Sequence, residues 1–231
     1  MIRSTLTTFV LAGLALGAIA CSSQQLVPDE VAPVIPEAVA DTDVPGIGRI
    51  GKWMIDPDGG IADWGGMQYE GQTIHEVINI IFIDSGASSA DDAKARLVDA
   101  MTKAGYPVRY HHSSGYRGVV DGEVYGQVPE QDAYAFSNRI YFLDNNHGRI
   151  FGPRKTANGW VFTGALSREH VDYIHRVHVY ASFSQARDNL ATRLTENSIY
   201  KRDGVVPLDN GSTADYTTGD HDGNAVVMKA Q

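Results

Sequence analysis

Two spacings of hydrophobic residues alternate along residues 46–202, and together they predict strands and helices within one folded domain. The run from Glu76 to Asp84, EVINIIFID, is nearly all apolar and β-branched, which is typical of a strand covered on both faces. From Ser89 to Gly105 apolar residues recur three and four positions apart behind a capping serine, which predicts an amphipathic helix. The same pattern predicts a second helix from Ser182 to Asn197.

Between the two helices the apolar period shortens to two, and turn residues recur. We expect turns at Asp121-Gly122, Asn145-Asn146 and Asn158-Gly159. The strands between and around them are expected at Tyr106 to His112, Gly118 to Val128, Arg139 to Leu143, Gly148 to Gly152, Trp160 to Leu166 and Asp172 to Tyr180. This order predicts a single α+β domain, with two helices on one face of a mixed or mostly antiparallel sheet.

The two ends of the chain differ in composition from this domain. Residues 21–45 contain four of the nine prolines, several acidic residues and no Lys or Arg, which predicts an extended, flexible tether. Residues 203–231 are rich in Gly, Ser, Thr, Asp and Asn, so we expect a flexible tail in which only Ala225 to Met228 has the pattern of a short strand.

Residues 1–20 have the pattern of a signal peptide, with one cation and an apolar run too short to span a bilayer. The following Ala18-Ile19-Ala20-Cys21 resembles the lipobox of bacterial lipoproteins, which implies cleavage before Cys21 and acylation of its thiol. An ordinary secretory signal is the alternative. Because Cys21 is the only cysteine, the mature chain can hold no intramolecular disulfide and no cysteine-ligated zinc.

Charge and motifs narrow the classes of partner. The formal net charge of −9 disfavours nucleic acid, whose phosphates would be repelled. The chain has no P-loop, no G-x-G-x-x-G and no G-x-S-x-G, so we expect no cofactor. The expected partners are a membrane, through the lipid anchor, and an envelope protein or anionic ligand, with the oligomeric state open. The anchor would lie in the outer membrane of a host with two membranes, and otherwise on the outer face of the cytoplasmic membrane.

Several blocks of the domain resemble a known family. They read NIIFIDSG, a helix ending in AGY, NRIYFLDNNHGRIFGP, WVFTGALSRE and YIHRVHVYASFSQARDNL. In this order they are similar to the LssY C-terminal domain family over residues 78–194, with matching positions at Asn146, His147, Arg149, Gly164, Arg168, His175 and Arg187-Asp188. The resemblance implies a cell-envelope setting, because members are often joined to membrane segments, but it carries no established activity.

The best candidates for chemistry are His147, Arg149, Arg168 and His178. Alternate residues of a strand share a face, so His147 and Arg149 should point the same way, and neighbouring strands can bring the other two alongside. Guanidinium groups bind phosphate or carboxylate, and imidazoles exchange protons near neutral pH. The structural alternative is that these cations only pair with carboxylates on solvated sheet faces.

The loop after His111-His112 is polar, so we expect that it could cover a binding site. No H-x-H or H-E-x-x-H spacing is present, so we expect no metal site.

The sequence leaves two hypotheses for function. The first is a membrane-anchored cell-envelope lipoprotein whose domain is a binding module without enzymatic activity. The second is a hydrolase or transferase acting on an anionic envelope substrate, a phosphoester or lipid headgroup, with His147 as acid or base and Arg149 or Arg168 binding the anion. The enzyme hypothesis requires that His147, Arg149 and His178 line one pocket. If these side chains point apart into solvent, that hypothesis fails.

The anchor can be tested by metabolic labelling. We expect cells expressing the chain to incorporate labelled palmitate into it, and a Cys21→Ser variant to incorporate none, because an acyl chain needs the thiol. Intact mass of the purified mature chain is the second measurement. A free thiol, or an N-terminus at another residue, would contradict the lipobox interpretation.

Overall fold

The computed structural model describes residues 32–231. The helices of this part are a short 3-10 helix at Pro36–Val39, α1 (Ala90–Lys103) and α2 (Phe183–Asn197). The strands are β1 (Asp41–Val44), β2 (Gly48–Gly51), β3 (Asp63–Tyr69), β4 (Gln72–His75), β5 (Ile80–Asp84), β6 (Val108–Tyr110), β7 (Arg117–Val120), β8 (Glu123–Val128), β9 (Tyr134–Ser137), β10 (Asn145–Thr156), β11 (Gly159–Asp172), β12 (Val177–Ser182), β13 (Tyr200–Pro207), β14 (Tyr216–Thr217) and β15 (Asn224–Ala230).

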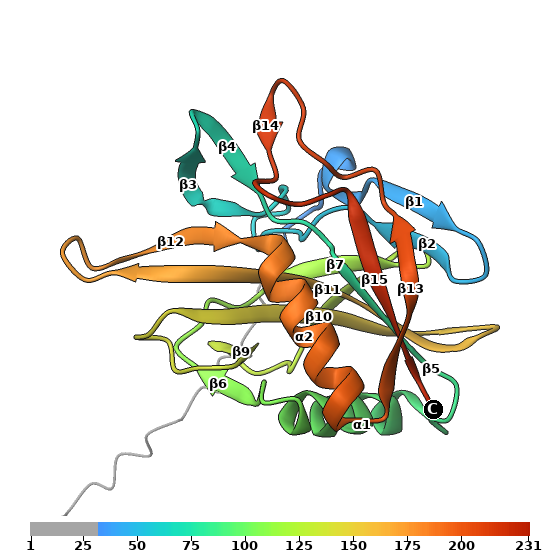
Figure 1. Ribbon diagram of the computed structural model, residues 1–231. Coiled ribbons are helices and arrows are strands. Elements are labelled where there is room, and N and C mark those ends of the chain that lie inside the picture. Colours follow the sequence, from blue (N-terminus) through green and yellow to red (C-terminus); the bar gives the residue numbers. More distant parts are fainter. Residues whose placement is uncertain (1–31) are drawn as a thin grey trace, which may run out of the picture. The chain divides into compact units, whose positions relative to one another are not determined.

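Twelve of these strands join one mixed sheet (Figure 1). Its main path runs β1-β2-β7-β8-β10-β11-β5-β15-β13, with β12 paired to β11, and with β9 beside β10 and β6 beside β9. Most pairs are antiparallel, while β15 runs parallel to β5. The strands β14, β4 and β3 form a separate three-stranded sheet, which lies above the main sheet in Figure 1. The expected α+β class, with one mixed sheet, is confirmed.

The core lies on both faces of the central strands. Along β5 every residue is buried, as its continuous apolar run predicts. Ile80 and Phe82 pack in one cluster with the apolar faces of both α1 and α2. Ile81 and Ile83 belong to a second cluster on the opposite face, which contains residues of β1, β2 and β7. The two helices therefore cover one face of the sheet, as expected.

Local signals explain both helices and one hairpin. Ser89 Oγ accepts a hydrogen bond from the Asp92 amide at 3.1 Å, and Ser182 Oγ accepts one from the Gln185 amide at 2.9 Å. These caps satisfy amides that the first helical turn leaves unpaired. Asp121 and Gly122 adopt φ values of 52° and 76°, the left-handed pair that a tight turn between β7 and β8 requires. These predicted elements are confirmed.

The hairpin predicted at Asn145-Asn146 is wrong. Both residues are buried in β10, and the expected strand from Arg139 to Leu143 is a loop. The reason is tertiary, because the Asn145 amide donates to Glu169 and to the Leu143 carbonyl and so has partners that a turn would not supply.

The single strand predicted from Asp172 to Tyr180 is also wrong. Asp172 ends β11, residues 173–176 form a turn, and β12 pairs back antiparallel onto β11. The Asp172 carboxylate accepts hydrogen bonds from the amides of Ile174 and His175 at 2.9 and 3.0 Å, which closes this turn. Arg176 therefore lies in the turn between the two strands.

The flexible tail expected at 203–231 is wrong as well. β15 lies between β5 and β13 in the sheet, and the polar residues around it have partners in the domain. Asp220 accepts the Phe183 amide at the start of α2, and Asn210 donates to the Lys52 and Ile78 carbonyls. A polar composition predicts disorder only where the rest of the chain provides no such partners.

The domain also begins earlier than expected. Within the predicted tether, residues 32–45 include the 3-10 helix and β1, which pairs with β2. The Thr42 hydroxyl donates to the Leu208 carbonyl at 2.7 Å, which links this segment to the end of the chain. The folded unit therefore covers 32–231 and not 46–202. Residues 1–31, with Cys21 and the signal peptide, lie outside the described residues.

A matched pair of substitutions tests the role of β15. Val226→Asp places a charge at a fully buried position of the sheet and should lower the free energy of unfolding by about 4 kcal/mol or more. Val205→Asp, on the neighbouring β13 at a position 48 % exposed, should change it by less than about 0.5 kcal/mol. Urea unfolding followed by circular dichroism measures both. Equal, small effects would mean that β15 is not part of the core.

Candidate functional site

One pocket collects most of the titratable groups that the sequence singled out. Its volume is about 300 Å³. The lining residues come from β3, from the segment before β5, from the loops after β6 and β9, and from β10, β11 and β12; they are Trp64, Gly65, Glu76, His111, His112, Ser113, Tyr116, Tyr141, His147, Arg149, Glu169 and His178.

The pairing of β10 with β11 aligns the polar side chains of the pocket. Asn145 lies opposite Glu169 and His147 lies opposite Ser167. Because side chains alternate along both strands, these side chains and Arg149 lie on one face of the sheet. This is the face opposite the helices, which also carries the second apolar cluster. β12 pairs with the end of β11 and adds His178. The predicted common orientation of His147 and Arg149 is confirmed, and His178 lines the same pocket.

Arg168 does not join them. It follows Ser167 by one position on β11, so its side chain points to the opposite face, where its Nη1 donates to Asn146 Oδ1 at 3.1 Å. Asn146 in turn donates to the Tyr106 hydroxyl at 3.0 Å. Of the four predicted residues, the pocket therefore holds His147, Arg149 and His178, while Arg168 belongs to a polar cluster on the face of the helices.

Glu169 connects the imidazoles. Its Oε1 lies 2.7 Å from His178 Nδ1, and its Oε2 lies 3.8 Å from His147 Nδ1. The Asn145 amide also donates to the carboxylate. Burial raises the pKa of Glu169, and the neighbouring His178 opposes that rise. With a side chain only 5 % exposed, Glu169 lies within ion-pair distance of His178, whose side chain is 16 % exposed.

His147 and His112 are neutral near pH 7. Burial, with help from the Arg149 charge, lowers the pKa of His112 to about 4 and the pKa of His147 well below its usual range. His147 Nδ1 lies 3.2 Å from Asn145 Oδ1, and its Nε2 lies 3.4 Å from the Ser167 hydroxyl. His147 therefore has both ring nitrogens engaged, and its neutrality means that its contact with Glu169 is not an ion pair.

Arg149 is held in place and still has hydrogen-bonding capacity. Its Nε and Nη2 donate to the Ser113 carbonyl, and its Nη2 also donates to the Ser113 hydroxyl at 2.8 Å. The guanidinium lies over the Tyr116 ring, 4.2 Å from the centroid. No hydrogen bond within residues 32–231 uses Nη1. The loop after β6 thus orients the cation and leaves two N–H groups for a ligand.

Glu76 supplies a second carboxyl group in the pocket. Its side chain is buried, and no hydrogen bond or ion pair among the described residues involves its carboxylate. Burial raises the pKa of Glu76 to about 7, although the Arg149 charge opposes the rise. The group therefore titrates near neutral pH, so the pocket can change its charge there.

Three buried nitrogen atoms of the lining have no hydrogen-bond partner within residues 32–231, namely Nε2 of His112, Nε1 of Trp64 and Nδ1 of His178, whose short contact with Glu169 lacks hydrogen-bond geometry. Buried polar atoms without partners are uncommon in folded domains and often mark the place of a ligand or water. Sequence reasoning missed Glu76, Tyr141 and Glu169. Only Glu76 had a local signal, a charged residue at the start of an apolar run, while the loop of His111 and His112 was expected to cover a site.

Within residues 32–231 no group of three or more His, Cys, Asp or Glu side chains is arranged to hold a metal ion. Among the helices of the same residues, none combines the length and the apolar character needed to cross a membrane.

Comparisons with family models, with curated proteins and with solved structures found no match for this chain. The likeness to the LssY C-terminal domain family therefore stays a prediction from the sequence.

The ionisation of Glu76 predicts a pH-dependent effect on stability. Its pKa rises from 4.5 in the unfolded chain to about 7 in the folded one, so losing the proton destabilises the fold. The penalty is absent below pH 4.5, grows through this window and is complete above pH 7. Relative to the wild type, Glu76→Gln should therefore gain roughly 3 kcal/mol of unfolding free energy between pH 4 and pH 8.

Urea titrations across that pH range measure this difference, with Glu196→Gln on the exposed side of α2 as the control. A Glu76→Gln difference that stays constant with pH would contradict a buried, ionising Glu76.

Proposed function

We propose that this pocket binds a small anionic ligand, with a phosphate ester as the type, and transfers or hydrolyses its anionic group by acid–base chemistry. One observation carries the proposal: the free Nη1 of Arg149 and the His178–Glu169 pair line the same pocket. A guanidinium with spare donors suits an anion, and an imidazole beside a carboxylate suits proton transfer. This arrangement favours the second sequence hypothesis over a binding module without activity.

The roles follow from the contacts. Arg149, fixed by Ser113, binds the anionic oxygens through Nη1. His178 takes the proton of an attacking water or hydroxyl and returns it to the leaving oxygen, while Glu169 orients the ring and stabilises its charged form. His147 has both nitrogens engaged and a lowered pKa, so it positions Asn145 and Ser167 rather than exchanging protons.

Because the pKa of Glu76 is raised to about 7, the pocket is suited to an anion at neutral pH and below. When the carboxyl group is protonated, Arg149 is left as an uncompensated cation on that side of the pocket. When the proton is lost, the carboxylate competes with the ligand for the same guanidinium.

We also propose that the domain works at a membrane of the cell envelope, attached through acylated Cys21. The support is the lipobox-like sequence before the only cysteine. An anchored enzyme of this kind would meet phosphate esters and lipid headgroups of the envelope at high local concentration.

Three substitutions separate binding from chemistry, with para-nitrophenyl phosphate as substrate and inorganic phosphate as ligand. Arg149→Met should weaken phosphate binding by about tenfold or more, because it removes a charged donor. His178→Gln should keep phosphate binding and lower turnover by about a hundredfold. Arg168→Met, which removes a guanidinium outside the pocket, is the matched control and should change neither.

Calorimetry measures the binding and absorbance measures the turnover. If the wild type binds phosphate but His178→Gln has normal turnover, the acid–base role is wrong. If the wild type does not bind phosphate, the anion pocket itself is wrong.

A further inference from the structure

A second cavity adjoins the pocket and has a different chemistry. This apolar groove, of about 360 Å³, is lined by Val108, Arg109, Tyr110, His111, Ile140, Tyr141 and Phe142. It shares His111 and Tyr141 with the polar pocket. The Tyr141 ring stacks on His178, with centroids 4.0 Å apart. One side chain thus forms a wall of the apolar groove and also contacts the proposed acid–base residue.

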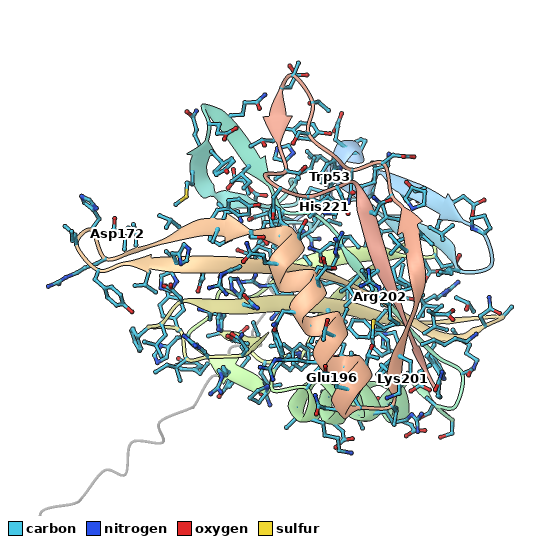
Figure 2. All side chains as sticks on the ribbon, viewed as in Figure 1. Trp53, Asp172, Glu196, Lys201, Arg202 and His221 are labelled. Atoms are coloured by element: carbon cyan, nitrogen blue, oxygen red, sulfur yellow. The ribbon has the colours of Figure 1, made fainter. Side chains whose placement is uncertain are left out.

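The groove exposes apolar side chains that a folded domain normally covers. Tyr110 is 53 % exposed, Ile140 is 51 % exposed and Phe142 is 59 % exposed. The tip of the β11–β12 hairpin extends this surface, because the Tyr173 hydroxyl donates to the Phe142 carbonyl at 3.3 Å. Figure 2 shows Asp172 at the outer end of that hairpin, far from α2. Clustered exposure of this kind is typical of a surface that binds an apolar ligand, a membrane or another protein.

The charges beside the groove favour a negative ligand. Arg109 lines the groove, and Arg139 directly precedes Ile140 in the loop after β9. Among residues 32–231 neither arginine takes part in an ion pair, although the whole chain has a formal net charge of −9. In so acidic a protein, unpaired cations around an apolar surface next to an anion pocket complement an amphiphile with a negative head.

We propose that the ligand of this site is a single-chain anionic amphiphile, whose phosphate head binds at Arg149 and whose hydrocarbon tail lies in the apolar groove. This inference rests on the proposed function, since it assigns the head to the same pocket. Tyr141 and His111 separate the two parts, so the junction of head and tail passes between the polar and apolar cavities. The tail gains its affinity from burial against Tyr110, Ile140 and Phe142.

The test compares two ligands with the same head, ethyl phosphate and octyl phosphate, by calorimetry with residues 32–231, the compact unit, below the micellar concentration. Octyl phosphate should bind at least about tenfold more tightly, because its additional methylene groups leave water. Phe142→Ser together with Ile140→Ser should reduce this ratio to about threefold or less. Val205→Ser, on β13 at a position of similar exposure, is the matched control and should leave the ratio unchanged.

The other results overturn the inference in distinguishable ways. Equal affinities for the two phosphates would exclude the amphiphile and leave the anion pocket standing, whereas no binding of either would remove the proposed function as well. Octanol binding as tightly as octyl phosphate would show that the groove acts without the pocket. A fourth result would assign the exposed surface to a bilayer instead. In that case the protein binds phosphatidylglycerol vesicles, and its affinity for monomeric alkyl phosphates does not depend on the length of their chain.

Discussion

The site depends on the antiparallel pairing of two long strands, β10 and β11. Side chains of a strand alternate between its two faces, so this register sends Ile150 and Leu166 to the helices and sends His147, Arg149 and Glu169 to the other face. On that face Phe151 continues the row as part of the core. One strand pair therefore builds core and pocket together, and a slip of one residue would exchange them.

The burial of ionisable groups around the β10–β11 pair determines which groups of the pocket carry a charge. Low solvation raises the pKa of Glu76 and of Glu169 and lowers that of His112 and of His147, so each group shifts toward its neutral form. The carbonyl and hydroxyl of Ser113 and the ring of Tyr116 hold the Arg149 guanidinium in place. The result is a site where one fixed cation faces groups shifted toward their neutral forms, beside the His178–Glu169 pair to which the proposed chemistry is assigned.

Prediction from the sequence succeeded where the signal is local. The serine caps of α1 and α2 and the apolar run of β5 depend on residues within a few positions of one another. It failed where distant residues decide, as at Asn145, whose amide finds Glu169 across the β10–β11 pair. Prediction of the site was limited in the same way. The alternation of side chains along a strand correctly grouped His147 with Arg149. It could not show that Arg168 lies outside the pocket or that Glu76 lies inside it.

The sequence by itself determined the helices, the central buried strand, the tight turn between β7 and β8 and the α+β class, because spacing and capping act over short range. Only the tertiary structure decided that β15 enters the sheet beside β5, and that the pocket joins groups from Trp64 to His178. The physical reason is that hydrogen bonds between strands and the desolvation of ionisable groups depend on neighbours far along the chain.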